Sequence, residues 1–184
     1  MAEFPEILDT LKRAAASLQD AGVPFALGGG LACWVRGGPE TEHDIDFMVT
    51  PEHADQALDT LMKAGFRPEK PPEDWLYKAH DGDVLIDVIF NPRGGPIDDA
   101  VLERAEELEV HAVRMPVMRL EDVMVTKLLA LREHEVDYES VLEIARTLRE
   151  QIDWDDVRRR TADSPYARAF FFLAEELEIV PRAT

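Results

Sequence analysis

The chain has 184 residues, of which 46% are hydrophobic and 32% are charged, a composition typical of a soluble globular protein. Its net charge of −18 argues against a broad nucleic-acid surface, because such a surface ordinarily carries an excess of Lys and Arg. No apolar stretch approaches the roughly 18 residues of a membrane span, and the acidic N-terminus does not resemble a signal peptide. With a single cysteine there is no intrachain disulfide, so we expect a cytoplasmic protein without a membrane partner.

Helices and strands alternate in the first part of the chain. The apolar spacing of residues 4–21 predicts a helix that covers a sheet. The segments PFALG (24–28) and DIDFMV (44–49) predict strands. A second helix is predicted over 51–64, with Gly65 as its end signal.

A hairpin is predicted next. The segments WLYKAH (75–80) and VLIDVIFNP (84–92) are separated by Asp-Gly-Asp, a strong turn signal, so their strands should be antiparallel neighbours. A short helix is predicted over 97–108, and 109–118 is predicted as a last strand closed off by Pro116.

Everything after these strands is predicted to be helical. The expected helices span 121–133, 139–150, 153–162 and 165–178. The consecutive Phe170, Phe171 and Phe172 cannot all face one side of the last helix. The sequence therefore predicts an α+β fold, with a mixed β-sheet flanked by helices in a core of residues 1–118 and a C-terminal helical lobe of residues 119–184.

Three aspartates are the main candidates for chemistry. Side chains on a strand alternate, so Asp44 and Asp46 share one side of theirs. Asp87 interrupts an apolar run typical of a buried strand, where an ionised group is costly without a partner. If the two strands are neighbours, the three carboxylates can bind Mg²⁺ or Mn²⁺. The alternative is a half-exposed strand and a strand-end aspartate bonded to backbone.

A glycine turn precedes these acids. Gly28, Gly29 and Gly30 lie between a predicted strand and a predicted helix. A turn of this kind lets backbone N–H groups approach an anion closely, so it is a candidate phosphate site. Lys78, on the first arm of the predicted hairpin, is a second candidate for triphosphate binding if it points toward the acids.

The stretch LGGGLACWVRGGPETEHDIDFMV resembles the core of the DNA polymerase β-type nucleotidyltransferases, with Asp87 in the place of the third acid. The resemblance implies the minimal nucleotidyltransferase fold and a nucleoside triphosphate (ATP or CTP) substrate. It also implies catalysis by Asp44, Asp46 and Asp87 around Mg²⁺. The family's usual Ser is replaced by Leu31, and Arg36 is the candidate basic residue for a phosphate contact.

Length and tail resemble the AbiEii-like and MenT-like branch from toxin–antitoxin systems, which has a lysine on a helix after the core and an acid beyond it. Lys127 and Asp137 follow in that order. This resemblance implies a catalytic Lys127, an Asp137 that positions it or a substrate, a tRNA end as acceptor and a cognate antitoxin.

Several alternatives stay open at this point. The acidic composition suits a cationic small-molecule acceptor, such as an aminoglycoside-like or lincosamide-like antibiotic, or a protein hydroxyl better than it suits tRNA. A non-catalytic, partner-binding protein of the same fold is a third possibility. The run Arg158, Arg159 and Arg160 is either a basic patch or, next to its acidic neighbours, a solvated helix face. Lys127 is either catalytic or a solvated helix lysine, and His43 is a candidate to orient Asp44.

Overall fold

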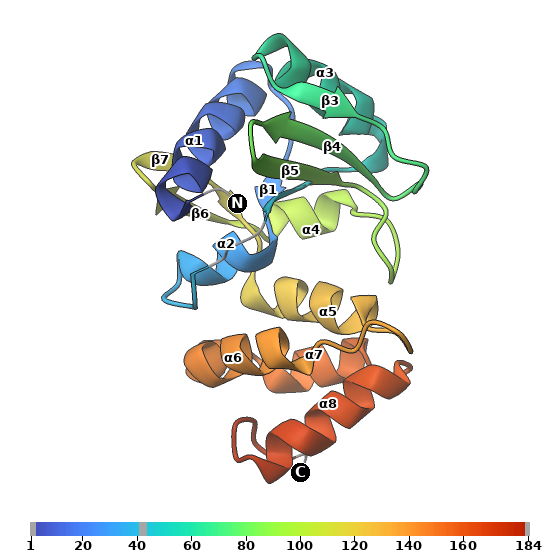
Figure 1. Cartoon of the computed structure of the whole chain (residues 1–184). Helices are drawn as coiled ribbons and strands as arrows, with labels where there is room; N and C mark the ends of the chain where they lie inside the picture. The colour runs from blue at the N-terminus through green and yellow to red at the C-terminus, as the bar shows by residue number, and fades with distance from the viewer. Residues whose placement is uncertain (1–2, 41–43, 183–184) are drawn as a thin grey trace.

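The computed structural model describes residues 3–40 and 44–182, so His43 lies outside the described residues. The strands form a mixed sheet with helices packed on it, and a further layer of helices lies below the sheet in Figure 1. This architecture confirms the predicted α+β fold. No helix in the described part of the chain is long and apolar enough to cross a membrane.

The strands in chain order are β1 (Ala26–Leu27), β2 (Ile45–Met48), β3 (Arg67–Glu69), β4 (Leu76–Asp81), β5 (Val84–Ile89), β6 (Glu106–Val110) and β7 (Val113–Val117). The helices are α1 (Phe4–Asp20), α2 (Gly29–Trp34), α3 (Ala54–Lys63), α4 (Asp99–Glu103), α5 (Leu120–Ala130), α6 (Tyr138–Leu148), α7 (Trp154–Arg160) and α8 (Pro165–Glu176). Two 3₁₀ turns, η1 (Pro51–His53) and η2 (Arg149–Gln151), precede α3 and follow α6.

The sheet has the strand order β3-β4-β5-β2-β1-β7-β6. The predicted β4–β5 hairpin is confirmed, with antiparallel pairing from Leu76↔Ile89 to Asp81↔Val84. β5 then pairs with β2 in parallel. The hydrophobic core contains the residues that alternate with the acids, including Ile45 and Phe47 on β2, while α1 and α3 pack against the sheet.

The segment 97–118 differs from the prediction. The helix ends at Glu103, and the residues expected to complete it form β6 instead. β6 and β7 are a hairpin rather than one strand, because His111 and Ala112 both have positive φ (48° and 64°) and turn the chain in two residues. Pairs of positive φ values are typical of the tight turns that match strand twist. Pro116 lies inside β7, opposite Glu107.

The C-terminal helices agree with the prediction within a few residues at each end. Of the three successive phenylalanines, Phe170 and Phe171 are buried, whereas Phe172 has 69% of its surface exposed. The predicted boundary at residue 118 falls between β7 and α5, and the division into a core and a helical lobe remains a prediction. α5 packs against α2 on the core side and against α6, α7 and α8 on the other.

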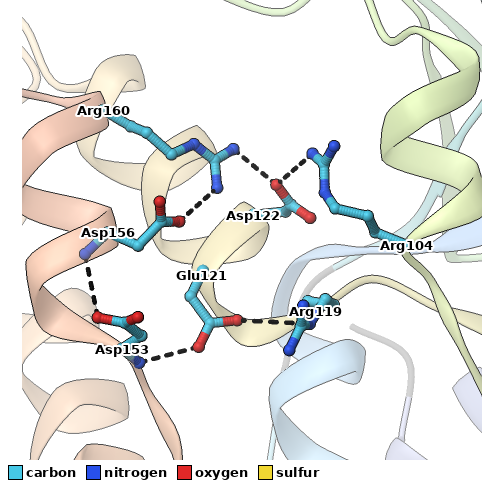
Figure 2. Close-up of a pocket in the computed structure, with 7 residues that line it drawn as sticks. All are labelled: Arg104, Arg119, Glu121, Asp122, Asp153, Asp156 and Arg160. Atoms are coloured by element: carbon cyan, nitrogen blue, oxygen red, sulfur yellow. Dashed lines mark hydrogen bonds and ion pairs between the residues drawn. The ribbon is translucent and has the colours of Figure 1, made fainter.

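An ion-pair network joins α5 to the elements on both sides of it (Figure 2). Asp122 of α5 is only 3% exposed and accepts hydrogen bonds from Arg104 (3.0 Å), which follows α4, and from Arg160 (2.6 Å) of α7. Glu121 accepts from the backbone N–H of Asp153, the N-cap of α7 (2.9 Å). A buried carboxylate without such partners would be strongly destabilising. The network therefore fixes the position of α5.

Candidate active site

The glycine turn is in direct contact with Asp46. Gly28 caps the start of α2, and its N–H donates to the carbonyl oxygen of Asp46 on the neighbouring strand (2.8 Å). Gly29 has a φ of +57°, and a Cβ at this position would lie 1.6 Å from Oδ2 of Asp46. Only glycine fits there, because both the backbone conformation and the space exclude a side chain.

Asp46 and Asp87 are direct neighbours across β2 and β5. The parallel register pairs them, so their side chains leave the sheet on the same face. Lys78 is paired with Asp87 from the other side, and its ammonium donates to Oδ1 of Asp87 at 2.9 Å. Asp44 directly precedes β2, and its charge adds to the rise in the pKa of both Asp46 and Asp87. The structure therefore brings Asp46, Asp87 and Lys78 together. The sequence made the pairing of the two strands a condition and left the direction of Lys78 open.

The environment opposes ionisation of Asp46. Burial, and after it the charge of Asp87, raise the pKa of Asp46 from 3.8 to about 7, and Lys127 and Lys78 act in the opposite direction. Burial also raises the pKa of Asp87, while its hydrogen bond from Lys78 lowers it. Two acids this close cannot both ionise at low cost, unless a cation lies between them.

A cleft of about 670 Å³ opens beside Asp46, between the sheet and α5. Its volume is in the range of small-molecule sites. Gly29 and Asp46 line one part of it, and Lys127 projects from α5. Within residues 3–40 and 44–182, Lys127 forms no ion pair with an acid, and its charge lowers the pKa of Asp46. An unpaired ammonium beside the acids is suited to an anionic ligand.

Sequence comparison decides the family. A family model described as uncharacterised nucleotidyltransferase matches residues 6–177, which is most of the chain. The chain belongs to this nucleotidyltransferase family. The nucleotidyltransferase resemblance in the sequence is thereby confirmed. The narrower AbiEii-like and MenT-like branch remains a prediction. No curated protein matches the chain by sequence.

Solved structures share the fold of this nucleotidyltransferase. The antibiotic-resistance factor ANT(2'')-Ia has a TM-score of 0.69 at 18% identity, over 96% of this chain and 98% of its own. The lincosamide antibiotic adenylyltransferase LnuA, solved with lincomycin, has a TM-score of 0.54 at 16% identity, over 74% and 94%. JHP933 from Helicobacter pylori has a TM-score of 0.55 at 16% identity, over 96% and 82%. At these identities the likeness shows a common fold.

The donor set of the nucleotidyltransferase fits a hard divalent cation, since carboxylate oxygens are the ligands that Mg²⁺ prefers. Burial is the largest cause of the raised pKa of Asp46, and the nearby charge of Asp87 is the second, as expected where two acids share a cation site. Lys78 holds Asp87 in the structure, and the described residues contain no group of three or more His, Cys, Asp or Glu side chains already placed to hold a metal ion. The Lys78 ammonium would repel a cation bound at these acids, so we expect Asp87 to turn away from Lys78 when such a site closes.

Two predicted site residues have other partners in the nucleotidyltransferase. The guanidinium of Arg36 donates to the carbonyl oxygen of Ala32 (2.8 Å) and to Glu106 (2.9 Å), and Arg36 is not among the residues that line the cleft. Asp137 caps α6 by accepting from the N–H groups of Glu139 and Ser140. Hydrogen bonds from Ser140 lower the pKa of Asp137, and Lys127 adds a smaller effect in the same direction.

Several residues that line the cleft were not predicted from the sequence. Trp75, Asn91 and Arg93 line it, and all three come from the segments that flank the β4–β5 hairpin. Arg93, like Lys127, forms no ion pair with an acid within the described ranges. The only sequence signal was position, because residues that flank strands carrying catalytic acids tend to border the same site.

Proposed function

We propose that the protein transfers a nucleoside monophosphate from a nucleoside triphosphate to an acceptor hydroxyl, with Mg²⁺ held by Asp44, Asp46 and Asp87. The observation that carries the proposal is the register of Asp46 with Asp87 beneath the Gly29 turn, next to a cleft that contains an unpaired Lys127. Family membership supports the reaction class.

The proposed transfer forms one phosphorus–oxygen bond, breaks another and needs few protein groups. The acceptor oxygen attacks the α-phosphorus, the bond from that phosphorus to the β-phosphate oxygen breaks, and pyrophosphate leaves. The hydroxyl proton moves to a carboxylate oxygen of Asp87. A bound divalent cation would supply charge neutralisation of the phosphate oxygens and would favour the ionised acceptor hydroxyl.

The cleft supplies the phosphate contacts in this proposal. The ammonium of Lys127 would neutralise charge on the triphosphate, and the backbone of Gly28, Gly29 and Gly30 would let the phosphates approach closely. Asp137 would help to position Lys127 through the attraction between their charges. Lys78, when Asp87 turns to a cation, would be free to contact a phosphate as well.

We propose a small cationic acceptor in preference to a tRNA end. The net charge of −18 disfavours a polyanion. The run at 158–160 does not form a free basic patch, because Arg158 pairs with Glu175, Arg159 with Asp156, and Arg160 with Asp122 and Asp156. ANT(2'')-Ia, solved with adenylyl-2''-tobramycin, and LnuA, solved with lincomycin, act on or bind antibiotics of such a size. The toxin-like alternative retains tRNA as acceptor and a cognate antitoxin as partner.

Label transfer tests the proposed reaction. The protein is incubated with Mg²⁺ and each of the four α-³²P-labelled ribonucleoside triphosphates, together with an aminoglycoside and lincosamide panel or with total tRNA. We expect label on a member of the antibiotic panel and release of unlabelled pyrophosphate. Label on tRNA alone would support the toxin-like alternative, and the absence of label on every acceptor together with the absence of nucleotide binding would contradict the proposed function.

Lys127→Met tests the role of the cleft in this assay, with Lys63→Met as its control. It removes the ammonium and keeps a long apolar side chain, and we expect at least a tenfold loss of transfer, because one well-placed charge contributes about 1.4 kcal/mol or more to the transition state. Lys63→Met, at an exposed position near the end of α3, should leave the rate unchanged. Equal rates for the two variants would exclude Lys127 from the reaction.

A further inference from the structure

An exposed indole lies in the same cleft as the acids. Trp75 has 36% of its surface exposed, although tryptophan is usually well buried. It lines the cleft that Gly29, Asp46 and Lys127 also line. Its ring has no aromatic partner in the part of the chain that the structure describes, whereas Trp34 contacts Phe4 and Trp154 contacts Phe171. The fold therefore leaves this one indole accessible to a ligand.

The backbone fixes the position of Trp75. Its carbonyl oxygen accepts the N–H groups of both Phe90 and Asn91, each at 3.1 Å. These bonds join the residue before β4 to the residues after β5, the strand that carries Asp87. The fixed backbone lowers the cost of ordering this residue when a ligand binds, and a tryptophan side chain has only two torsions to fix, so Trp75 is suited to be a binding surface.

The lining of the cleft combines a polar and an apolar part. Asp46, the glycine turn and the ammonium of Lys127 belong to the polar part. The apolar side chains that share the lining with Trp75 are Met48, Ile89, Pro92, Val123 and Ala130. A ligand that fits both parts has an anionic group and a flat, weakly polar ring. A nucleoside triphosphate has this combination.

We infer that Trp75 is the surface on which the base of the nucleoside triphosphate stacks. The inference rests on the proposed function, and it adds a residue that holds the base to the residues that hold the phosphates. Stacking on an aromatic side chain accepts any base, because each base has a π face. Trp75 therefore contributes affinity for nucleotides over simple polyphosphates, and it is a binding residue rather than a catalytic one.

Calorimetry with ATP and with inorganic tripolyphosphate, both with Mg²⁺, separates base binding from phosphate binding. Trp75→Ala should weaken ATP binding about 5- to 150-fold, which corresponds to the ~1–3 kcal/mol of one stacked base. Binding of tripolyphosphate should be unchanged, because it has no base. Trp75→Phe should retain most of the ATP affinity, and Phe172→Ala, which removes an exposed aromatic ring of α8, should retain all of it.

Fluorescence gives a second readout that a purely structural role would not change. ATP should quench the tryptophan emission of the wild-type protein, and Trp75→Phe should abolish the quenching, although Trp34 and Trp154 still emit. Unchanged ATP affinity in Trp75→Ala, or an equal loss of ATP and tripolyphosphate binding, would overturn the inference alone. If the wild-type protein binds neither ATP nor tripolyphosphate, the proposed function itself is contradicted.

Discussion

Asp46→Asn should abolish nucleotidyl transfer and, at the same time, stabilise the metal-free protein. Loss of a carboxylate that holds the cation and the reacting phosphate should lower the rate at least about a thousandfold, equivalent to ~4 kcal/mol. The stabilisation follows from the neighbourhood of Asp46, where burial and Asp87 make its ionised form unfavourable. A residue selected for stability alone would show the opposite effect.

The stabilisation should depend on pH with a defined sign. Asp46 has a pKa of about 7 in the folded protein against 3.8 in the unfolded chain. Between about pH 4 and 7 the folded state therefore binds more protons, and the free energy of unfolding of the wild type decreases as pH rises. Asn does not titrate. Since Asp46 keeps some exposure, the advantage of Asp46→Asn should grow from near zero at about pH 4 to ~1–2 kcal/mol at about pH 8.

Urea denaturation with a metal chelator at both pH values measures this difference. Asp59→Asn is the matched control for the loss of one carboxylate, because Asp59 is exposed on α3 and is not among the residues that line the cleft, so its replacement should not change activity. If Asp46→Asn were less stable than the wild type at about pH 8, Asp46 would be a structural residue, and its proposed role in the reaction would be contradicted.

Gly29→Ala should cost both stability and activity. The φ of +57° is strained for alanine, and the added Cβ would meet Oδ2 of Asp46 at 1.6 Å, so the carboxylate must move away from its position. We expect a loss of about 3 kcal/mol or more in the free energy of unfolding, well above the ~1–2 kcal/mol of backbone strain alone. Transfer should fall with it, because the displaced group is catalytic in our proposal.

Gly22→Ala is the matched control for backbone strain. Gly22 has a φ of +66°, but no atom lies within 4 Å of its ideal Cβ position. The difference between the two alanine variants therefore isolates the contact with Asp46. In an Asp46→Ala background, Gly29→Ala should cost little more than Gly22→Ala, because the conflicting carboxylate is gone. If Gly29→Ala cost as much stability in that background as in the wild type, the contact with Asp46 would not be the cause.

The acidic part of the site was predictable because it depends on local patterns. Asp44 and Asp46 are two residues apart in the sequence, and the tight turn at residues 82–83 sets the register that places Lys78 opposite Asp87. The pairing of β5 with β2 is different, since it joins segments far apart in the chain. The sequence made this pairing a condition of the metal-site hypothesis, and resemblance to a family supported it.

Other features carry no local signal. The β6–β7 hairpin turns at His111 and Ala112, which lack the Asn-Gly or Asp-Gly sequence usual at positive φ, so the segment was predicted as one strand. Trp75 belongs to the cleft because the backbone bonds of β4 and β5 and the position of α5 place it there. The partner of Arg36 is Glu106 on the edge strand, and no sequence pattern connects the two residues.

Asp46 and Asp87 should hold a divalent cation together with a nucleotide. Anomalous diffraction from crystals grown with Mn²⁺ and a non-hydrolysable ATP analogue would locate that cation. We expect a manganese peak between the two carboxylates and the nucleotide phosphates, with the ammonium of Lys78 released from Asp87. A nucleotide bound without manganese at these acids, with the 2.9 Å contact between Lys78 and Asp87 intact, would contradict it.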